Sequence, residues 1–291
     1  MAMIIGTQAY TWHQYCEGEG KKLADELDRV LGEVAAAGLK AWEGTISHEA
    51  EADQHAALLE KHGLSMPSMY TGARLHDPEW RAAADEVVAR GRLAKRAGTR
   101  WLVVNPDPLR WGAKEDKTDD QLRRQAEALR YIGRALDEQG QMLVYHAHDM
   151  EMRNAAREFH HMLRSTADLP VGWCLDAHWA FRGAGNSNVA LQDLLGMYGD
   201  RVATLHLRQS HNGIWSELLE EGDVDHEPIF ELLRRIHFAG PAMLEICSEK
   251  GTPRTLPHAE AHRRSARWFT ERLQAAGPDS ESPGTTAGAA R

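Results

Sequence analysis

Short runs of apolar, β-branched and aromatic residues alternate with longer amphipathic stretches along most of the chain. This alternation is typical of parallel strands joined by helices. The runs long enough for one strand each occupy residues 3–10, 39–45, 64–70, 100–105, 141–148, 171–176, 202–206 and 242–246. The pattern therefore predicts an α/β fold with eight strands.

The intervening stretches have the spacing of helices that bury one face. Residues 21–38 and 119–140 are the clearest examples. In the second stretch, apolar residues recur three or four positions apart at Leu122, Ala126, Leu129, Ile132 and Leu136. We expect these side chains to pack against the strands.

Residues that start and stop helices frame these stretches. Thr118 and Asp119 precede Gln121, where a side-chain oxygen can accept a hydrogen bond from a free backbone N–H group. Glycines that stand between a helical stretch and the next strand, where a positive φ ends a helix, are Gly38, Gly63, Gly98, Gly140 and Gly240. The repetition indicates one module used many times.

Eight strand and helix units without a break in composition favour a single (β/α)8 TIM barrel over an open doubly wound sheet. We assign residues 1–274 to this barrel. Residues 275–291 consist mainly of Gly, Pro, Ser, Thr and Ala and contain too little apolar surface to offset the entropy of ordering. They are predicted to be a disordered tail.

Composition narrows the classes of function. The chain has 34 Lys and Arg against 43 Asp and Glu, a net charge of −9, which disfavours binding to nucleic acid or acidic membranes. No window approaches 18 uninterrupted apolar residues, and the N-terminus lacks a basic leader followed by an apolar stretch. Three scattered cysteines are too few for a disulfide framework. We expect a cytoplasmic protein with buried thiols.

Charged residues and histidines close the last four predicted strands. In a TIM barrel the active site lies at the carboxyl ends of the strands, so these residues are expected to share one rim. They are His146, His148, Glu151, Asp176, His178, His206, Arg208, Glu245 and Glu249.

Two of these residues are carboxylates inside apolar strands and need a positive partner. Glu245 stands in AMLEI and Asp176 in WCLDAH, while His206 in TLHLR offers a nitrogen ligand beside them. Carboxylates with an imidazole suit Mn²⁺ or Mg²⁺, with Co²⁺ or Zn²⁺ as replacements. The alternative is a buried salt-bridge network that includes Arg208.

The chain resembles the xylose isomerase-like barrels, which comprise sugar isomerases, sugar epimerases and inosose dehydratases, with the endonuclease IV type as relatives. The resemblance covers nearly the whole chain before the tail. It is carried by YHAHDME at 145–151, LDAHW at 175–179, LHLRQS at 205–210, EGDVDH at 221–226 and LEICSE at 244–249.

The resemblance implies that Asp176, His206 and Glu245 are metal ligands. The ligand from strand five is open, because the family's epimerases have a glutamate where this chain has His146. We expect Glu151 to be that ligand, with direct ligation by His146 as the rival hypothesis.

The resemblance also implies roles for other rim residues. His146 and His148 are expected to transfer protons, with Glu245 as a further candidate base. His178 and Arg208 are expected to bind substrate, and Glu43, which ends residues 39–45, to orient other site residues. Aromatic residues expected near the mouth, where they suit sugar rings, are Tyr10, Trp12, Trp111, Trp179 and Trp215.

The function expected from this resemblance is a divalent-metal-dependent isomerase or epimerase, or a dehydratase or lyase. Its substrate would be a keto-sugar, cyclitol or related polyol, and the reaction a proton abstraction next to a metal-bound carbonyl. The HAHDME variant of the strand-five motif favours the dehydratase or lyase branch. The alternatives are a metal phosphodiesterase of the endonuclease IV type and a non-catalytic carbohydrate-binding barrel. A homo-oligomer is left open.

Overall fold

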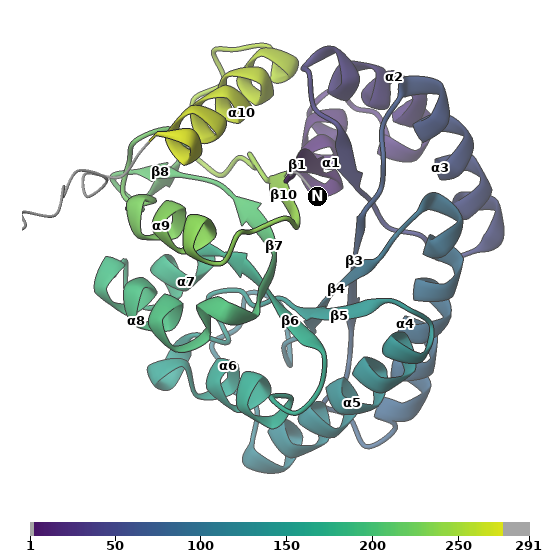
Figure 1. The fold of residues 1–291 in the computed structure, drawn as a ribbon, viewed down its shortest axis with the longest axis vertical. Coiled ribbons are helices and arrows are strands. Elements are labelled where there is room, and N and C mark those ends of the chain that lie inside the picture. The colour runs from purple at the N-terminus through teal and green to yellow at the C-terminus, as the bar shows by residue number, and fades with distance from the viewer. Residues whose placement is uncertain (1–2, 276–291) are drawn as a thin grey trace, which may run out of the picture.

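Eight parallel strands form a central barrel surrounded by helices in the computed structural model, which describes residues 3–275 (Figure 1). The strands follow the order β2-β1-β10-β7-β6-β5-β4-β3. The two outermost strands of this order meet through bridges between Ala41 and Ser65 and between Gly44 and Met69. The barrel is therefore nearly closed, and the predicted (β/α)8 TIM barrel is confirmed.

Each predicted strand region overlaps an observed strand of the barrel. The strands are β1 (Ile4–Gln8), β2 (Ala41–Glu43), β3 (Ser68–Ala73), β4 (Trp101–Pro106), β5 (Met142–Tyr145), β6 (Val171–Asp176), β7 (Val202–Leu207) and β10 (Pro241–Leu244). The main differences are at strand ends: β5 stops at Tyr145, three residues before the predicted end. A hairpin of β8 (Ser210–His211) and β9 (Ile214–Trp215), which the sequence did not predict, follows β7.

The helices that surround the barrel are α2 (Leu23–Ala36), α3 (Glu49–His62), α4 (Trp80–Ala94), α5 (Asp119–Glu138), α6 (Arg153–Ser165), α8 (Asn188–Tyr198), α9 (Glu227–Arg235) and α10 (His258–Gln274). Single 3-10 turns occur at Lys95–Ala97 and Gly199–Arg201. Two shorter helices, α1 (Ala9–Gly18) and α7 (Ala177–Gly183), begin immediately after β1 and β6. They stand at the carboxyl ends of their strands, where the functional residues are expected.

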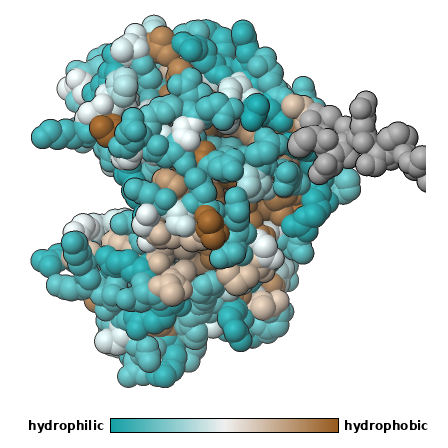
Figure 2. Space-filling view, turned by 90° about the vertical axis from the view of Figure 1, so that its left-hand side faces the viewer, coloured by the Kyte–Doolittle hydropathy of each residue, from teal (hydrophilic) through white to brown (hydrophobic). Residues whose placement is uncertain are grey.

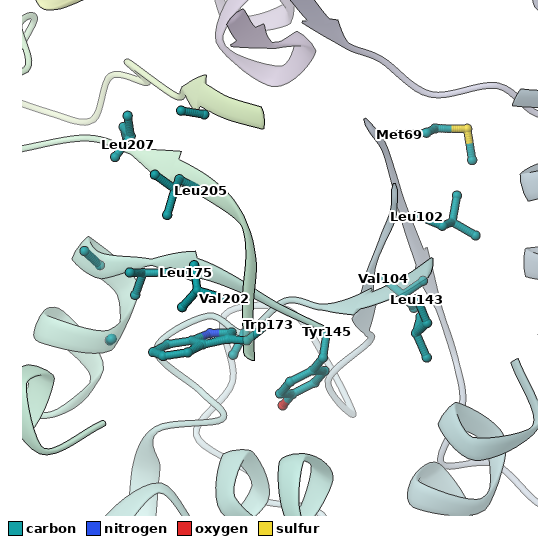
Figure 3. Packing of buried hydrophobic residues seen from close by; sticks show 14 of the residues in the cluster. Met69, Leu102, Val104, Leu143, Tyr145, Trp173, Leu175, Val202, Leu205 and Leu207 are labelled. Atoms are coloured by element: carbon teal, nitrogen blue, oxygen red, sulfur yellow. The ribbon is translucent and has the colours of Figure 1, made fainter. Parts of the chain in front are cut away.

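The main core lies between the strands and the helices. Figure 3 shows apolar side chains, among them Val104, Leu143 and Leu205, on the outer side of the strands, facing the helices. The predicted apolar face of α5 is buried at all five positions. A smaller cluster of Val103, Val144 and Cys174 packs apart from this core. Since neighbouring residues of a strand point to opposite sides, this cluster fills the barrel interior.

Most of the predicted helix stops are confirmed. Gly38, Gly63, Gly98 and Gly140 have positive φ angles between 64° and 87°. The prediction for Gly240 was wrong, because the left-handed residue after α9 is His237, with a φ of 50°. Gly240 is required for a different reason, since a Cβ atom there would lie 2.1 Å from the carbonyl oxygen of Ala203.

The cysteines, Trp12 and the C-terminal tail are the remaining features predicted from the sequence. Cys16, Cys174 and Cys247 are free and buried, as expected. Trp12, which was expected near the mouth, is instead buried and donates a hydrogen bond to Thr7. Apart from Ala275, the tail predicted over residues 275–291 lies outside the described residues.

The surface visible in Figure 2 is mostly hydrophilic, with hydrophobic residues gathered near the middle and an indentation at the left edge. Within residues 3–275, no helix has the length and apolar character needed to cross a membrane.

The start of α5 supports a first testable prediction. The Oγ1 atom of Thr118 accepts a hydrogen bond from Gln121 N at 3.3 Å, and Gln121 Oε1 accepts one from Thr118 N at 2.9 Å. A Thr118→Ala substitution removes the first bond and should lower the free energy of unfolding by about 1 kcal/mol in chemical denaturation. The Thr118→Ser control retains the oxygen and should stay close to the parent. An equal loss in both variants would contradict the capping role.

Candidate active site

Strand alternation places a set of polar side chains above the interior cluster of Val103, Val144 and Cys174. The residue two positions further along each chain segment points to the same side, which brings Asn105, His146 and Asp176 to the next layer. His206 pairs in register with Asp176 in β6 and Met243 in β10. Glu245 follows β10 directly, so residues from five neighbouring strands meet at the carboxyl end of the barrel.

Four buried ligand-type atoms converge at this end; within the described residues three of them lack a hydrogen-bond partner, and the fourth, Glu245 Oε2, is ion-paired with Arg208. They are Asp176 Oδ2, His206 Nδ1, Glu245 Oε2 and His146 Nε2. One ligand atom each of Asp176, His206 and Glu245 lies within 4.8 Å of the other two. His146 Nε2 is 3.8 Å from Asp176 Oδ2, and His206 Nδ1 is 3.3 Å from Glu245 Oε2. The arrangement directs two imidazole nitrogens and two carboxylate oxygens toward one small region.

Hydrogen bonds on the opposite side of the rings set the tautomers of the histidines. Glu43 Oε1 accepts a hydrogen bond from His206 Nε2 at 2.7 Å, while Glu43 Oε2 accepts one from Ser68 at 2.6 Å. The proton on His206 Nε2 leaves Nδ1 free to act as a ligand. The expectation that Glu43 orients another site residue agrees with this contact.

Asn105 holds the other two histidines in the same way. Its Nδ2 group donates a hydrogen bond to the carbonyl oxygen of Pro106, which turns Oδ1 toward the histidine rings. Asn105 Oδ1 accepts hydrogen bonds from His148 Nδ1 at 2.9 Å and from His146 Nδ1 at 3.4 Å. The Nε2 atom of each ring is thereby left as an acceptor.

Arg208 is the cation nearest to the two carboxylates. Its Nη2 atom lies 2.5 Å from Glu245 Oε2 and 3.7 Å from Asp176 Oδ2. The salt-bridge network considered from the sequence is therefore present in part. It sets three buried carboxylates, Glu43, Asp176 and Glu245, against one guanidinium group, so Arg208 alone does not balance them.

Burial and charge shift the protonation of these groups strongly. Burial lowers the pKa of both His146 and His148 to about 3, so both rings are neutral near pH 7. Burial raises the pKa of Asp176, although Arg208 opposes it. Burial alone would also raise the pKa of Glu245, but Arg208 and His206 hold it well below its ordinary value.

His206 has the opposite balance. Burial alone would lower its pKa, but Cys174 and Glu43 beside the ring outweigh burial and raise the pKa well above its ordinary value. The raised pKa of His206 reflects the negative groups around its ring, and the lowered pKa of Glu245 reflects the positive groups beside its carboxylate.

The structure does not bring Glu151 to the group of possible metal ligands. Its Oε2 atom accepts a hydrogen bond from the backbone N–H of His148 at 2.7 Å, which keeps the carboxylate in the loop after β5. Burial and the nearby charge of Glu158 raise the pKa of Glu151 to about 7. The nearest imidazole from the same strand region, His146, lies closer to the other candidate ligands.

The two expected substrate-binding residues are placed differently. Arg208 lines the cavity above the barrel, with its guanidinium 4.5 Å from the centre of the Trp215 ring. His178 does not line this cavity, because the first turn of α7 directs it behind Trp179 and Trp215, each with its ring centre 6.1 Å away. Burial lowers the pKa of His178 to about 3.

The cavity at the barrel mouth has a volume of about 1120 Å³. His146, His148, Arg208 and Glu245 line its inner part together with Tyr70. Four of the five expected aromatic residues also line it: Tyr10, Trp111, Trp179 and Trp215. The indole N–H groups of Trp179 and Trp215 are buried without a hydrogen-bond partner among the described residues.

Sequence reasoning missed three residues of the site. Asn105 is a polar residue next to the end of β4, the same signal that pointed to Glu43 and to the residues of the last four strands. Tyr70 is the third residue of β3, and its ring centre lies 5.6 Å from that of His146. Cys174 offers a ligand atom within 4.8 Å of ligand atoms of His146 and His206, but nothing in the sequence distinguishes it from an ordinary core thiol.

Comparisons with known proteins agree with this architecture. A family model described as xylose isomerase-like TIM barrel matches residues 31–272 of the chain. No curated protein matches the chain.

Several solved structures share the fold. A sugar phosphate isomerase/epimerase from Parabacteroides distasonis has 17% identity and a TM-score of 0.71, over 94% of this chain and 95% of that one. An L-ribulose 3-epimerase has 18% identity and a TM-score of 0.71, again over 94% and 95%. A 3-keto-D-glucoside 4-epimerase from E. coli has 16% identity and a TM-score of 0.68, over 92% and 99%. At these identities the likeness shows a shared fold.

The buried carboxyl group of Glu151 should make stability depend on pH. Its pKa of about 7 in the folded state lies above the ordinary value of 4.5, so the folded state holds the proton more tightly than the unfolded state does. The stabilising contribution is complete below about pH 4.5 and is lost as pH rises through about 7. Glu151→Gln removes this titration. The variant should unfold with nearly the parent's free energy at pH 4.5 and with on the order of 3 kcal/mol more at pH 8.

Urea unfolding at several pH values checks this expectation. The matched control is Glu231→Gln, which changes an exposed carboxylate on α9. A stability difference between Glu151→Gln and the parent that does not change with pH would contradict the shifted pKa.

Proposed function

The chain belongs to the xylose isomerase-like TIM barrel family, and from this premise we propose that it is a divalent-metal-dependent isomerase or epimerase of a keto-sugar or related polyol. The observation that supports the proposal is the set of four buried ligand atoms that converge on one small region, where the guanidinium of Arg208 is the nearest cation to the carboxylates. A site of this kind costs stability unless something else satisfies it.

The donor set fits a divalent cation. Asp176, His206 and Glu245 would hold the ion, and His146 would supply the fourth donor through Nε2. We propose no ligand role for Glu151, because its carboxylate accepts a hydrogen bond from the backbone N–H of His148. Two carboxylates and two imidazoles suit Mn²⁺ or Mg²⁺, with Co²⁺ or Zn²⁺ as replacements.

The outer contacts of these ligands also match those of metal sites. A ligating histidine usually donates its second N–H group to a carboxylate or carbonyl oxygen. His206 donates to Glu43 and His146 donates to Asn105. The ion would stabilise negative charge that develops on a carbonyl oxygen of the substrate.

The residues around the donors can hold and move a proton. His148 lines the cavity, is neutral near pH 7, and has Nε2 free because Nδ1 donates to Asn105. We assign His148 Nε2 and the Glu245 carboxylate to removal and return of the proton beside the carbonyl group. Arg208 and the indole N–H groups of Trp179 and Trp215 would hold substrate oxygens. We assign no substrate contact to His178.

Two alternatives receive less support. A trinuclear phosphodiesterase site needs separate groups of ligands, whereas the two candidate groups within residues 3–275 share His206. The lyase branch is supported by the strand-five motif alone, while the similar solved structures are those of an isomerase/epimerase and two epimerases. We therefore place isomerisation or epimerisation first.

Metal content tests the ligand assignment. After loading with Mn²⁺ and desalting, the parent should retain a stoichiometric ion, and Asp176→Asn, His206→Ala and Glu245→Gln should each bind Mn²⁺ at least ten-fold more weakly. Glu249→Gln is the matched control, because Glu249 is on the same rim but pairs with Arg182 at 2.9 Å. Unchanged metal affinity in all three ligand variants would refute the site.

Hydrogen exchange with solvent tests the reaction. The Mn²⁺-loaded enzyme in D₂O should place deuterium on the carbon next to the carbonyl group of a ketose or a 3-keto-glucoside, detected by NMR. His148→Ala should slow this exchange by roughly 10²- to 10⁴-fold while it retains the ion, because a positioned proton-transfer group is lost. Exchange at the parent's rate in His148→Ala would remove His148 from the mechanism. Formation of an unsaturated ketone without exchange would indicate the lyase branch instead.

A further inference from the structure

The cavity at the barrel mouth is larger than a single sugar ring needs. Sites that enclose most of a drug-sized ligand measure roughly 300–1,000 Å³, and a free hexose is much smaller than such a ligand. The cavity volume here is about 1120 Å³. Of the proposed ligands only His146 and Glu245 line this cavity, beside His148, so most of its lining is available to another portion of the substrate.

Aromatic side chains dominate this outer part. Trp111 is 56% exposed and Tyr10 is 50% exposed, although both are large apolar residues. Exposed apolar surface at the edge of a site is typical of a place where a ligand binds. Trp111 also meets His148 edge to face, with ring centres 5.2 Å apart. The outer part is thus continuous with the residues assigned to proton transfer.

The loop that carries Trp111 is held in place. Arg153 donates hydrogen bonds to Asp116 at 2.8 Å and to the carbonyl oxygen of Ala113 at 3.1 Å. The side chain of Asn154 donates to Asp116 at 2.7 Å. These contacts fix the loop against the start of α6, so Trp111 is positioned before a ligand arrives.

The charges around the cavity favour a neutral ligand in the outer part. Three cationic residues line the cavity, but Arg208 is paired with Glu245 and Arg153 with Asp116. Lys114 has no ion pair among the described residues, so it is a single unpaired cation on the lining. A phosphate group would need several converging cations that are not already paired.

We propose that the substrate is a glycoside whose reacting ring carries a ketone and lies beside Glu245 and His148, while a second neutral ring lies against Trp111 and Tyr10. This inference rests on the proposed function for the position of the reacting ring. Both an aromatic aglycone and a second sugar present a flat apolar face, which is the shared chemistry that an indole or phenol ring recognises.

Calorimetric titration of the Mn²⁺-loaded full chain tests the outer site. The probes are glucose, glucose 6-phosphate, both anomers of methyl and phenyl glucoside, and a glucose disaccharide. A two-ring probe should bind at least ten-fold more tightly than methyl glucoside. A preference for phenyl glucoside identifies an aromatic aglycone, and a preference for the disaccharide identifies a second sugar.

Substitutions connect this preference to the aromatic residues. Trp111→Ala should reduce the affinity ratio between the two-ring probe and methyl glucoside toward one, and Tyr10→Ala should reduce it independently. Met197→Ala is the matched control, because Met197 is also 56% exposed but lies on α8 and does not line the cavity. This control should keep the parent's ratio.

The proposal is overturned if methyl and two-ring probes bind equally, if no glucoside binds, if glucose 6-phosphate binds most tightly, or if both aromatic variants keep the parent's ratio. Deuterium incorporation, measured separately, reports on the proposed reaction. A binding preference without deuterium incorporation would refute the reaction and leave the glycoside site standing. Deuterium incorporation into free ketoses without a preference for two-ring probes would refute the glycoside site and leave the proposed reaction standing.

Discussion

Negative charge buried at the carboxyl end of the barrel is the constraint on which the site depends. A carboxylate removed from water must be paired with a cation or with hydrogen-bond donors. Arg208 partly serves Glu245 and, at a greater distance, Asp176. The atoms that remain unsatisfied face one another, which no arrangement optimised for stability alone would favour. The surrounding structure therefore gives up stability at this end of the barrel.

The neighbouring residues maintain this arrangement by fixing each ring from behind. Glu43 occupies the second nitrogen of His206, and Ser68 in turn occupies the second oxygen of Glu43. Asn105 does the same for His146 and His148, with its own orientation set by Pro106. These supporting side chains come from strands β2, β3 and β4, whereas the motifs found in the sequence lie on the last four strands. The whole barrel therefore contributes to a site whose ligands come from one half of it.

Much of this could be predicted from the sequence because strand geometry is regular. The apolar runs located the strands, and alternation placed Asp176, His206 and Glu245 at one end. The positions of side chains in loops and at helix starts were harder to predict from the sequence. Glu151 follows the end of β5 by six residues, so its position depends on how the loop turns, and the His148 backbone captures it. His178 was expected in the cavity, but the helix that begins directly after β6 directs it elsewhere. Asn105 could have been found by extending the rule for strand ends to β4.

The segment after β5 shows how the inner and outer parts of the cavity are coupled. It begins α6 with Asn154, Ala155 and Ala156 in the left-handed region, with φ between 53° and 56°. Such a conformation costs roughly 1–2 kcal/mol per non-glycine residue and persists only where other contacts enforce it. Here those contacts include the hydrogen bond from Asn154 to Asp116, in the loop that carries Trp111. The same segment contains Glu151, which holds the backbone of His148. One strained segment therefore restrains both the loop that carries Trp111 and the backbone of His148, and the rings of these two residues meet at the cavity.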